Sequence, residues 1–178
     1  MSRIDLLKLV GISGTNKVMA GELSRLARRA LDGYRIATPK KEGLGTLNYP
    51  FDPTLACVAL AYHRTCSRVL WGLFESRARR LEPLYDELVE DMKAENPEER
   101  GWLFDGARIS VQARNVQNFA AGERQIVGTV KNAIFDAADQ FGIGLEVDPY
   151  EPDILFVVRM HDDKLSLSVD LAGRAMHQ

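Results

Sequence analysis

Three residues of a predicted helix at about residues 123–141 have the types and the spacing to contact a phosphodiester backbone. Arg124, Gly128 and Lys131 follow one another at i, i+4 and i+7, so they share a helix face beside the apolar stripe. Arginine and lysine supply positive charge, and the glycine between them leaves room for a close approach. Further candidates precede this helix: Arg114, Asn115 and Asn118. The competing interpretation is a solvated helix face without a ligand.

The distribution of charge points to a second basic region. Residues 1–80 carry 14 basic and 6 acidic side chains, a net charge of +8, although the formal charge of the whole chain is −2. Residues 81–105 have a net charge of −7 and residues 106–178 one of −3, so the acidic stretch at 82–99 should face away from a polyanion. Five arginines of the basic region are the weaker candidates for binding: Arg25, Arg28, Arg29, Arg64 and Arg68. For Arg64 and Arg68, capping of helix carbonyls or internal pairing is the alternative.

Other short motifs do not support catalysis or metal binding. Gly11–Gly14 lies between a predicted strand and a predicted helix, but it lacks the third glycine of a dinucleotide fingerprint and the lysine of a P-loop. The segment 148–150 lacks the second proline of the loop found in amino-methylating enzymes, and the three histidines are not spaced as metal ligands. We therefore predict no catalytic residue and no metal ligand in this chain.

Composition narrows the class of protein. The 178 residues are 46% hydrophobic and 27% charged, which is typical of a globular protein and excludes a wholly disordered one. No apolar run approaches the roughly 18 residues of a membrane span, and the N-terminus lacks a signal-peptide core. Cys57 and Cys66 cannot form a disulfide framework. From these features we predict a cytoplasmic protein whose two cysteines are reduced thiols.

The elements that must position the basic residues begin with a β-α-β-β-α-β order, typical of a ferredoxin-like module at 1–75. Strands are predicted over 6–12, 34–38, 45–49 and 68–74, and helices over 16–32 and 54–66. Gly33 stands where the first helix needs a C-terminal cap, and Asp52 with Pro53 is typical of the start of the second.

A second module is predicted over 105–178, after a helical connector at 76–104. The connector combines an amphipathic helix over 81–92 with a polar linker over 94–100 that contains Pro97. The second module contains an alternating strand over 107–114, the helix over 123–141, and a hairpin over 153–160 and 164–171. The predicted class is α+β, a ferredoxin-like module followed by an α/β module.

Three segments of the second module resemble the THUMP domain: 130–136 (VKNAIFD), 151–154 (EPDI) and 165–173 (LSLSVDLAG). In order and spacing they are most similar to the THUMP domains of bacterial and archaeal RNA guanine-N2 methyltransferases. The segment 62–70 (YHRTCSRVL) resembles the ferredoxin-like domain that precedes THUMP in that family. The likeness is strong over 107–176 and moderate over 1–105.

The resemblance implies an RNA-binding portion of an S-adenosylmethionine-dependent RNA methyltransferase, positioning tRNA or rRNA for a Rossmann-like catalytic domain in cis or in trans. We expect residues 1–178 alone to bind no S-adenosylmethionine and to transfer no methyl group. In that family the cofactor belongs to the catalytic domain. Two alternatives stay open: a standalone RNA-binding adaptor, and a ferredoxin-like module that binds a small metabolite or dimerises.

Overall fold

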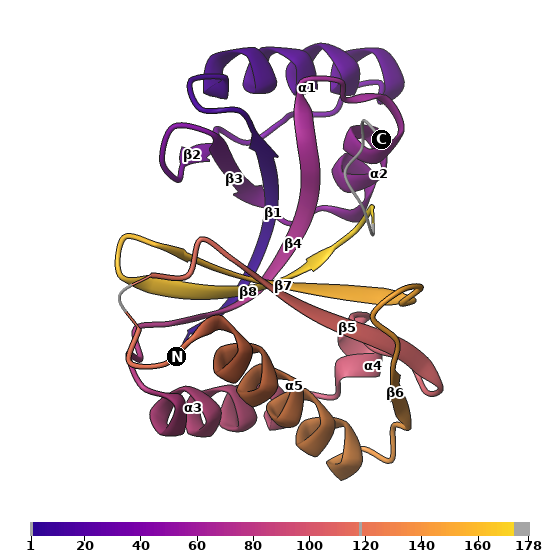
Figure 1. Ribbon diagram of the computed structural model, residues 1–178. Coiled ribbons are helices and arrows are strands. Elements are labelled where there is room, and N and C mark those ends of the chain that lie inside the picture. The colour runs from indigo at the N-terminus through magenta and orange to yellow at the C-terminus, as the bar shows by residue number, and fades with distance from the viewer. Residues whose placement is uncertain (1, 118, 173–178) are drawn as a thin grey trace. The chain divides into compact units, whose positions relative to one another are not determined.

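A computed structural model describes residues 2–117 and 119–172 of the chain (Figure 1). Within these residues it contains eight strands and five helices: β1 (Ser2–Gly11), α1 (Asn16–Ala30), β2 (Lys40–Lys41), β3 (Thr46–Pro50), α2 (Pro53–Tyr62), β4 (Cys66–Ser76), α3 (Leu81–Lys93), α4 (Pro97–Arg100), β5 (Ala107–Arg114), α5 (Glu123–Gln140), β6 (Leu145–Val147), β7 (Ile154–His161) and β8 (Lys164–Asp170). The hydrogen-bonded strand order is β2-β3-β1-β4-β8-β7-β5-β6. The predicted α+β class is confirmed.

Contacts divide the chain into two units. Among the described residues, the N-terminal unit consists of residues 5–72 and 170–172, and the C-terminal unit consists of residues 2–4, 73–117 and 119–169. The sequence predicts module limits at residues 75 and 105 with a connector between them. In the structure the connector helix α3 belongs to the C-terminal unit, where it packs against α5.

The core of the N-terminal unit forms between its sheet and the helices α1 and α2. Leu7 and Leu9 of β1 are fully buried and pair in antiparallel register with Tyr49 and Leu47 of β3. Between the two leucines the fully buried Lys8 forms an ion pair with Glu42, whose Oε1 lies 2.9 Å from the lysine Nζ. This pairing compensates a charge that would otherwise be costly in a core.

The helix starts of the N-terminal unit agree with the sequence, but the helix ends do not. Asp52 caps α2 by accepting a 2.9 Å hydrogen bond from the Thr54 N–H, as predicted. The predicted end of this helix at residue 66 is wrong, because the chain turns into extended backbone at His63. Similarly, α1 ends at Ala30, and Gly33 follows in the left-handed region with φ 69°.

The strand predicted over 34–38 is also wrong. The strand that pairs with β3 is only Lys40–Lys41. Pro39 precedes it and has no N–H to donate to a ladder. Tyr34 instead donates a hydrogen bond through its hydroxyl to the carboxylate of Asp52.

The C-terminal unit builds its core from β5, β7, β8 and α5. Strand β5 runs parallel to both β6 and β7. Its Ile109 is fully buried, while Val111 and Ala113, which follow at alternate positions of the strand, are half-buried. The Trp102 ring packs edge-on against the rings of Phe74 and Phe156, with centroids 6.0 and 5.8 Å away.

Two short elements of this unit differ from the sequence expectation. Residues 97–100, predicted to lie in a linker, form α4, because Pro97 occupies the first turn of that helix and the Asn96 side chain caps it. Strand β6 has three residues, too few to show an alternating pattern. Over the residues that the structure describes, no helix is long and apolar enough to cross a membrane.

Candidate nucleic-acid interface

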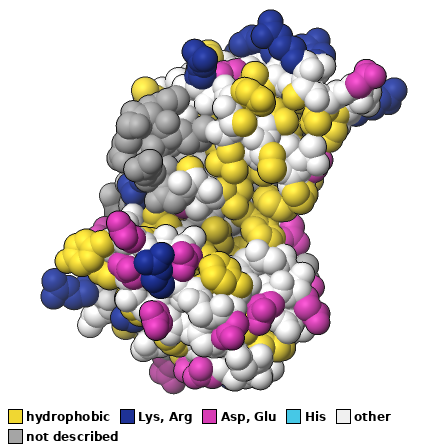
Figure 2. Space-filling model, turned by 90° about the vertical axis from the view of Figure 1, so that its right-hand side faces the viewer, with side chains coloured by type: hydrophobic (Ala, Val, Ile, Leu, Met, Phe, Trp, Pro, Cys, Tyr) yellow, Lys and Arg dark blue, Asp and Glu magenta, His cyan; other side chains and the backbone are white. Residues whose placement is uncertain are grey.

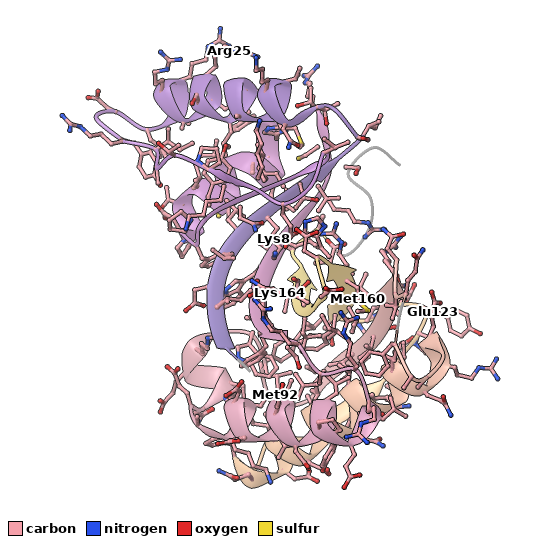
Figure 3. The ribbon with its side chains drawn as sticks, turned by 90° about the vertical axis from the view of Figure 1, so that its left-hand side faces the viewer. Lys8, Arg25, Met92, Glu123, Met160 and Lys164 are labelled. Carbon is pink, nitrogen blue, oxygen red and sulfur yellow. The ribbon has the colours of Figure 1, made fainter. Side chains whose placement is uncertain are left out.

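Three of the predicted arginines meet at one hollow of the N-terminal unit. This hollow, of about 370 Å³, is called the arginine hollow and is lined by Glu22, Arg25, Leu26, Arg29, Tyr62 and Arg64. Arg25 and Arg29 extend from successive turns of α1, and Arg64 lies in the segment between α2 and β4. Figure 3 shows Arg25 pointing outward from α1, and Figure 2 shows Lys and Arg side chains gathered over the same end of this unit.

A buried carboxylate fixes the geometry of the arginine hollow. Glu22 of α1, only 9% exposed, accepts hydrogen bonds from the backbone N–H groups of Arg64 and Thr65 at 2.6 and 3.1 Å. It also accepts one from the Thr65 hydroxyl at 2.5 Å. These bonds join α1 to the segment that carries Arg64, so the arginines of the two segments are held close together.

The pKa of Glu22 reflects this hydrogen bonding. Burial alone raises the pKa of its carboxyl, but hydrogen bonds from Thr65 and Arg64, together with the nearby His63, lower it further than burial raises it. The net pKa lies below its ordinary value, so the carboxylate is ionised at neutral pH. Its charge is directed at the backbone inside the unit, whereas the three arginines are exposed.

A buried histidine holds the chain between Tyr62 and Arg64. His63 is 3% exposed, and its Nε2 lies 3.0 Å from the carbonyl oxygen of Met19. Its Nδ1 accepts a 3.2 Å hydrogen bond from the Cys66 N–H. Because His63 points inward, its neighbours Tyr62 and Arg64 both point outward, where they are exposed.

The other two arginines predicted for this unit have different environments. Arg68 forms an ion pair with Asp170, whose side chain is fully buried, so the internal pairing that the sequence left open is the one observed. Arg28 is exposed and donates from its Nε to the Ser24 carbonyl at 3.3 Å, but it does not line the arginine hollow. The structure thus brings together three of the five.

The predicted site on α5 lies along one face of the helix, outside the two hollows lined by Arg25 and Asn115. Arg124 is exposed, Lys131 is half-buried, and a Cβ added at Gly128 would meet nothing within 4 Å. The expected space at the glycine is therefore present. We refer to these three residues as the α5 face.

The segment before α5 lies beside a second hollow. Asn115 is exposed, has the left-handed φ of 53°, and lines a space of about 350 Å³ with Arg79, Gln117 and His161 among others. Arg114 donates to the Gln112 side chain at 3.2 Å. Asn118 lies outside the described residues. Neither Arg124 nor Lys131 lines this hollow.

Tyr62 is an exposed residue of the arginine hollow that the sequence prediction missed, as it missed the buried Glu22. It is 60% exposed, which is unusual for a large aromatic ring, and it directly precedes His63 and Arg64. An aromatic residue next to a basic one was the available signal, but the same residues could equally have formed a buried helix end.

Among the described residues, no group of three His, Cys, Asp or Glu side chains could hold a metal ion.

No protein-family profile matches the chain. One curated relative is the ribosomal RNA large subunit methyltransferase K/L of Alteromonas mediterranea, 28% identical over 142 residues. The match covers 78% of this chain and 19% of the relative. The chain therefore spans about a fifth of the length of the relative it matches.

Solved structures share the fold. A predicted N6-adenine-specific DNA methylase from Listeria monocytogenes superposes with a TM-score of 0.73 and 22% identity, covering 100% of this chain and 43% of that one. A candidate methyltransferase complexed with SAH superposes with a TM-score of 0.70 and 20% identity, covering 98% of this chain and 43% of that one. A 4-thiouridine synthetase solved with RNA and ATP superposes with a TM-score of 0.54 and 18% identity, covering 94% of this chain and 41% of that one.

Proposed function

We propose that this chain is the RNA-binding portion of an S-adenosylmethionine-dependent RNA methyltransferase, and that it holds tRNA or rRNA for a separate catalytic domain. The observation that carries the proposal is the convergence of Arg25, Arg29 and Arg64 on one hollow. Like charges held this close repel one another, and an anion such as a phosphate relieves the repulsion. Phosphate contacts supply most of the affinity of proteins for nucleic acids.

The similar proteins favour RNA as the polyanion. The curated relative is a methyltransferase of ribosomal RNA, and one structural neighbour with a different chemistry was solved with RNA. The two similar proteins are therefore both associated with RNA, although one is a methyltransferase and the other a 4-thiouridine synthetase. We assign S-adenosylmethionine to the catalytic domain, in line with the neighbour that was solved with SAH.

The identities of the two domains belong to the same proposal. We infer that residues 105–178 form a THUMP domain and residues 1–75 a ferredoxin-like domain, on the segments that resemble the guanine-N2 methyltransferases. The α5 face would then be a second surface that binds phosphate, with Arg114 and Asn115 beside it.

The test is a titration of labelled tRNA and of an rRNA fragment, followed by fluorescence anisotropy at several salt concentrations. The double variant Arg25→Ala/Arg29→Ala should lower the slope of log affinity against log salt by roughly 0.7–0.9 for each phosphate that the variant no longer neutralises. Lys40→Ala/Lys41→Ala, which removes two exposed charges of the same unit, is the matched control and should change the slope less. Absence of salt-dependent RNA binding by the wild-type chain would refute the proposed function.

A further inference from the structure

Tyr62 stands between two adjoining hollows of different chemistry. One is the arginine hollow. The other, here the apolar hollow, has a volume of about 300 Å³ and is lined by Leu26, Arg29, Ala30 and Tyr62. The two share the side chains of Leu26, Arg29 and Tyr62, so they form one continuous surface on the described part of the N-terminal unit.

The lining of each hollow matches one part of a nucleotide. Arg25 and Arg64 line only the arginine hollow, where guanidinium groups can bind phosphate oxygens in pairs. Ala30 lines only the apolar hollow, where the contacts are aliphatic and aromatic. Arg29 lines both, and a side chain of this kind packs its stem on apolar surface while its charged end reaches a phosphate.

The ring of Tyr62 provides the stacking surface. It is 60% exposed at the last residue of α2, and the inward-pointing His63 holds the backbone beside it. Bases stack on such rings when they are not stacked in a duplex. Volumes of about 300 and 370 Å³ lie at the lower end of the range for small-molecule pockets.

We propose that these two hollows together bind one unpaired RNA nucleotide, with its base stacked on Tyr62 in the apolar hollow and its phosphate held by Arg25, Arg29 and Arg64. This inference rests on the proposed function, and it adds a preference for unpaired over paired RNA. A base inside a duplex is covered on both faces, so it cannot reach Tyr62. The internal base pairs of a blunt duplex can therefore use only the arginines.

The experiment compares three RNA probes by fluorescence anisotropy: a blunt duplex, the same duplex with an unpaired uridine tail, and the same duplex with an abasic tail. The uridine tail should bind more tightly than both others. The abasic tail adds phosphates without bases, so it separates stacking from charge.

Variants of the full chain locate the effect. Tyr62→Ala should lose the advantage of the uridine tail, a reduction of about 5- to 150-fold in affinity. Tyr62→Phe keeps the ring and should retain the advantage. Tyr150→Ala removes an aromatic ring of the C-terminal unit that is 91% exposed, and it should leave all three affinities unchanged.

The possible results separate this inference from the proposed function. If the wild-type chain binds the uridine tail no more tightly than the abasic tail, and with a clear salt dependence, the nucleotide site is refuted while the proposed function stands. If Tyr62→Ala retains the advantage of the uridine tail, the site is likewise refuted. If no probe binds at any salt concentration, both are refuted.

Discussion

The arginine hollow and the α5 face are predicted from the same kind of sequence signal, a helical repeat of cations, but only in the first do cations from two segments line one hollow. On α1, Arg25 and Arg29 are joined by Arg64 from another segment, because Glu22 ties that segment to the helix. On α5, Arg124 and Lys131 flank open space at Gly128, and they line none of the hollows described above. A helical repeat of cations thus places positive charge on both helices. Only on α1 does a cation from a second segment, Arg64, join them around one hollow.

The two surfaces should contribute to RNA affinity in different ways. Cations spread along one helix face contact a polyanion as separate charges, each of which is screened by salt and adds a modest amount to the affinity. A concave site can surround one phosphate with several donors and can also exclude water from a base. The arginine hollow should therefore contribute selectivity, and the α5 face mainly general affinity.

The largest effect should follow from removing the residue that makes the hollow concave. Glu22→Ala leaves the Arg64 N–H, the Thr65 N–H and the Thr65 hydroxyl without their shared acceptor, at a cost of about 2–4 kcal/mol in the free energy of unfolding. RNA affinity should fall as well, although no cation is removed. Urea unfolding and anisotropy measure the two effects.

The control for this variant is Glu123→Ala, which removes an exposed carboxylate at the start of α5. It should change the free energy of unfolding by about 0.5 kcal/mol or less. Equal stabilities of Glu22→Ala and the wild-type chain would show that the hollow does not depend on Glu22.

A smaller effect is expected on the α5 face. Arg124→Ala and Lys131→Ala should each lower the salt slope of RNA binding by roughly one unit. Gly128→Glu should weaken binding more than either, because it adds bulk and negative charge at the point of closest approach. The added side chain enters open space, so the circular dichroism spectrum should stay unchanged.

Gln140→Glu, at the other end of α5, adds the same charge to an exposed position and serves as the control. If Arg124→Ala/Lys131→Ala binds structured RNA as tightly as the wild-type chain at every salt concentration, the α5 face is only a solvated surface. The comparison would then leave the arginine hollow as the single site of the two.

The smallest effect is a change in pH dependence. The pKa of Glu22 is lower in the folded chain than its ordinary value of 4.5, so its ionised form stabilises the fold above pH 4.5. This stabilisation is lost as the pH falls through the lowered folded value. Glu22→Gln should therefore show a flatter decline of the urea midpoint below pH 4.5, whereas Glu123→Gln should decline as the wild-type chain does.

Patterns within one segment predicted the fold well. The alternation over 107–114 gave the bounds of β5, and the periodic stripe over 123–141 gave α5 to within one residue. The cap at Asp52 was likewise a local signal. Strand β6 was missed because three residues carry no period, and α4 because Pro97 was interpreted as a breaker when it begins a helix.

The site was only partly predictable, because its contacts are distant in sequence. The sequence named Arg25, Arg29 and Arg64 as cations, but the acceptor that gathers them, Glu22, acts across 42 residues. The partner of Arg68 lies 102 residues away, so its internal pairing could be offered only as an alternative. The role of Tyr62 depends on its exposure, which no helical pattern specifies.

The ion pair between Arg68 and Asp170 sets an order of events during synthesis. Asp170 belongs to the N-terminal unit, and so does the Leu171 N–H that donates to the Val69 carbonyl at 3.0 Å. A ribosome that adds about 5–20 residues per second needs about 5–20 s to travel from Arg68 to Asp170. Throughout that interval the guanidinium lacks its carboxylate, while the C-terminal unit is being made. The unit that leaves the ribosome first therefore cannot complete its native contacts until the C-terminal unit has also been made.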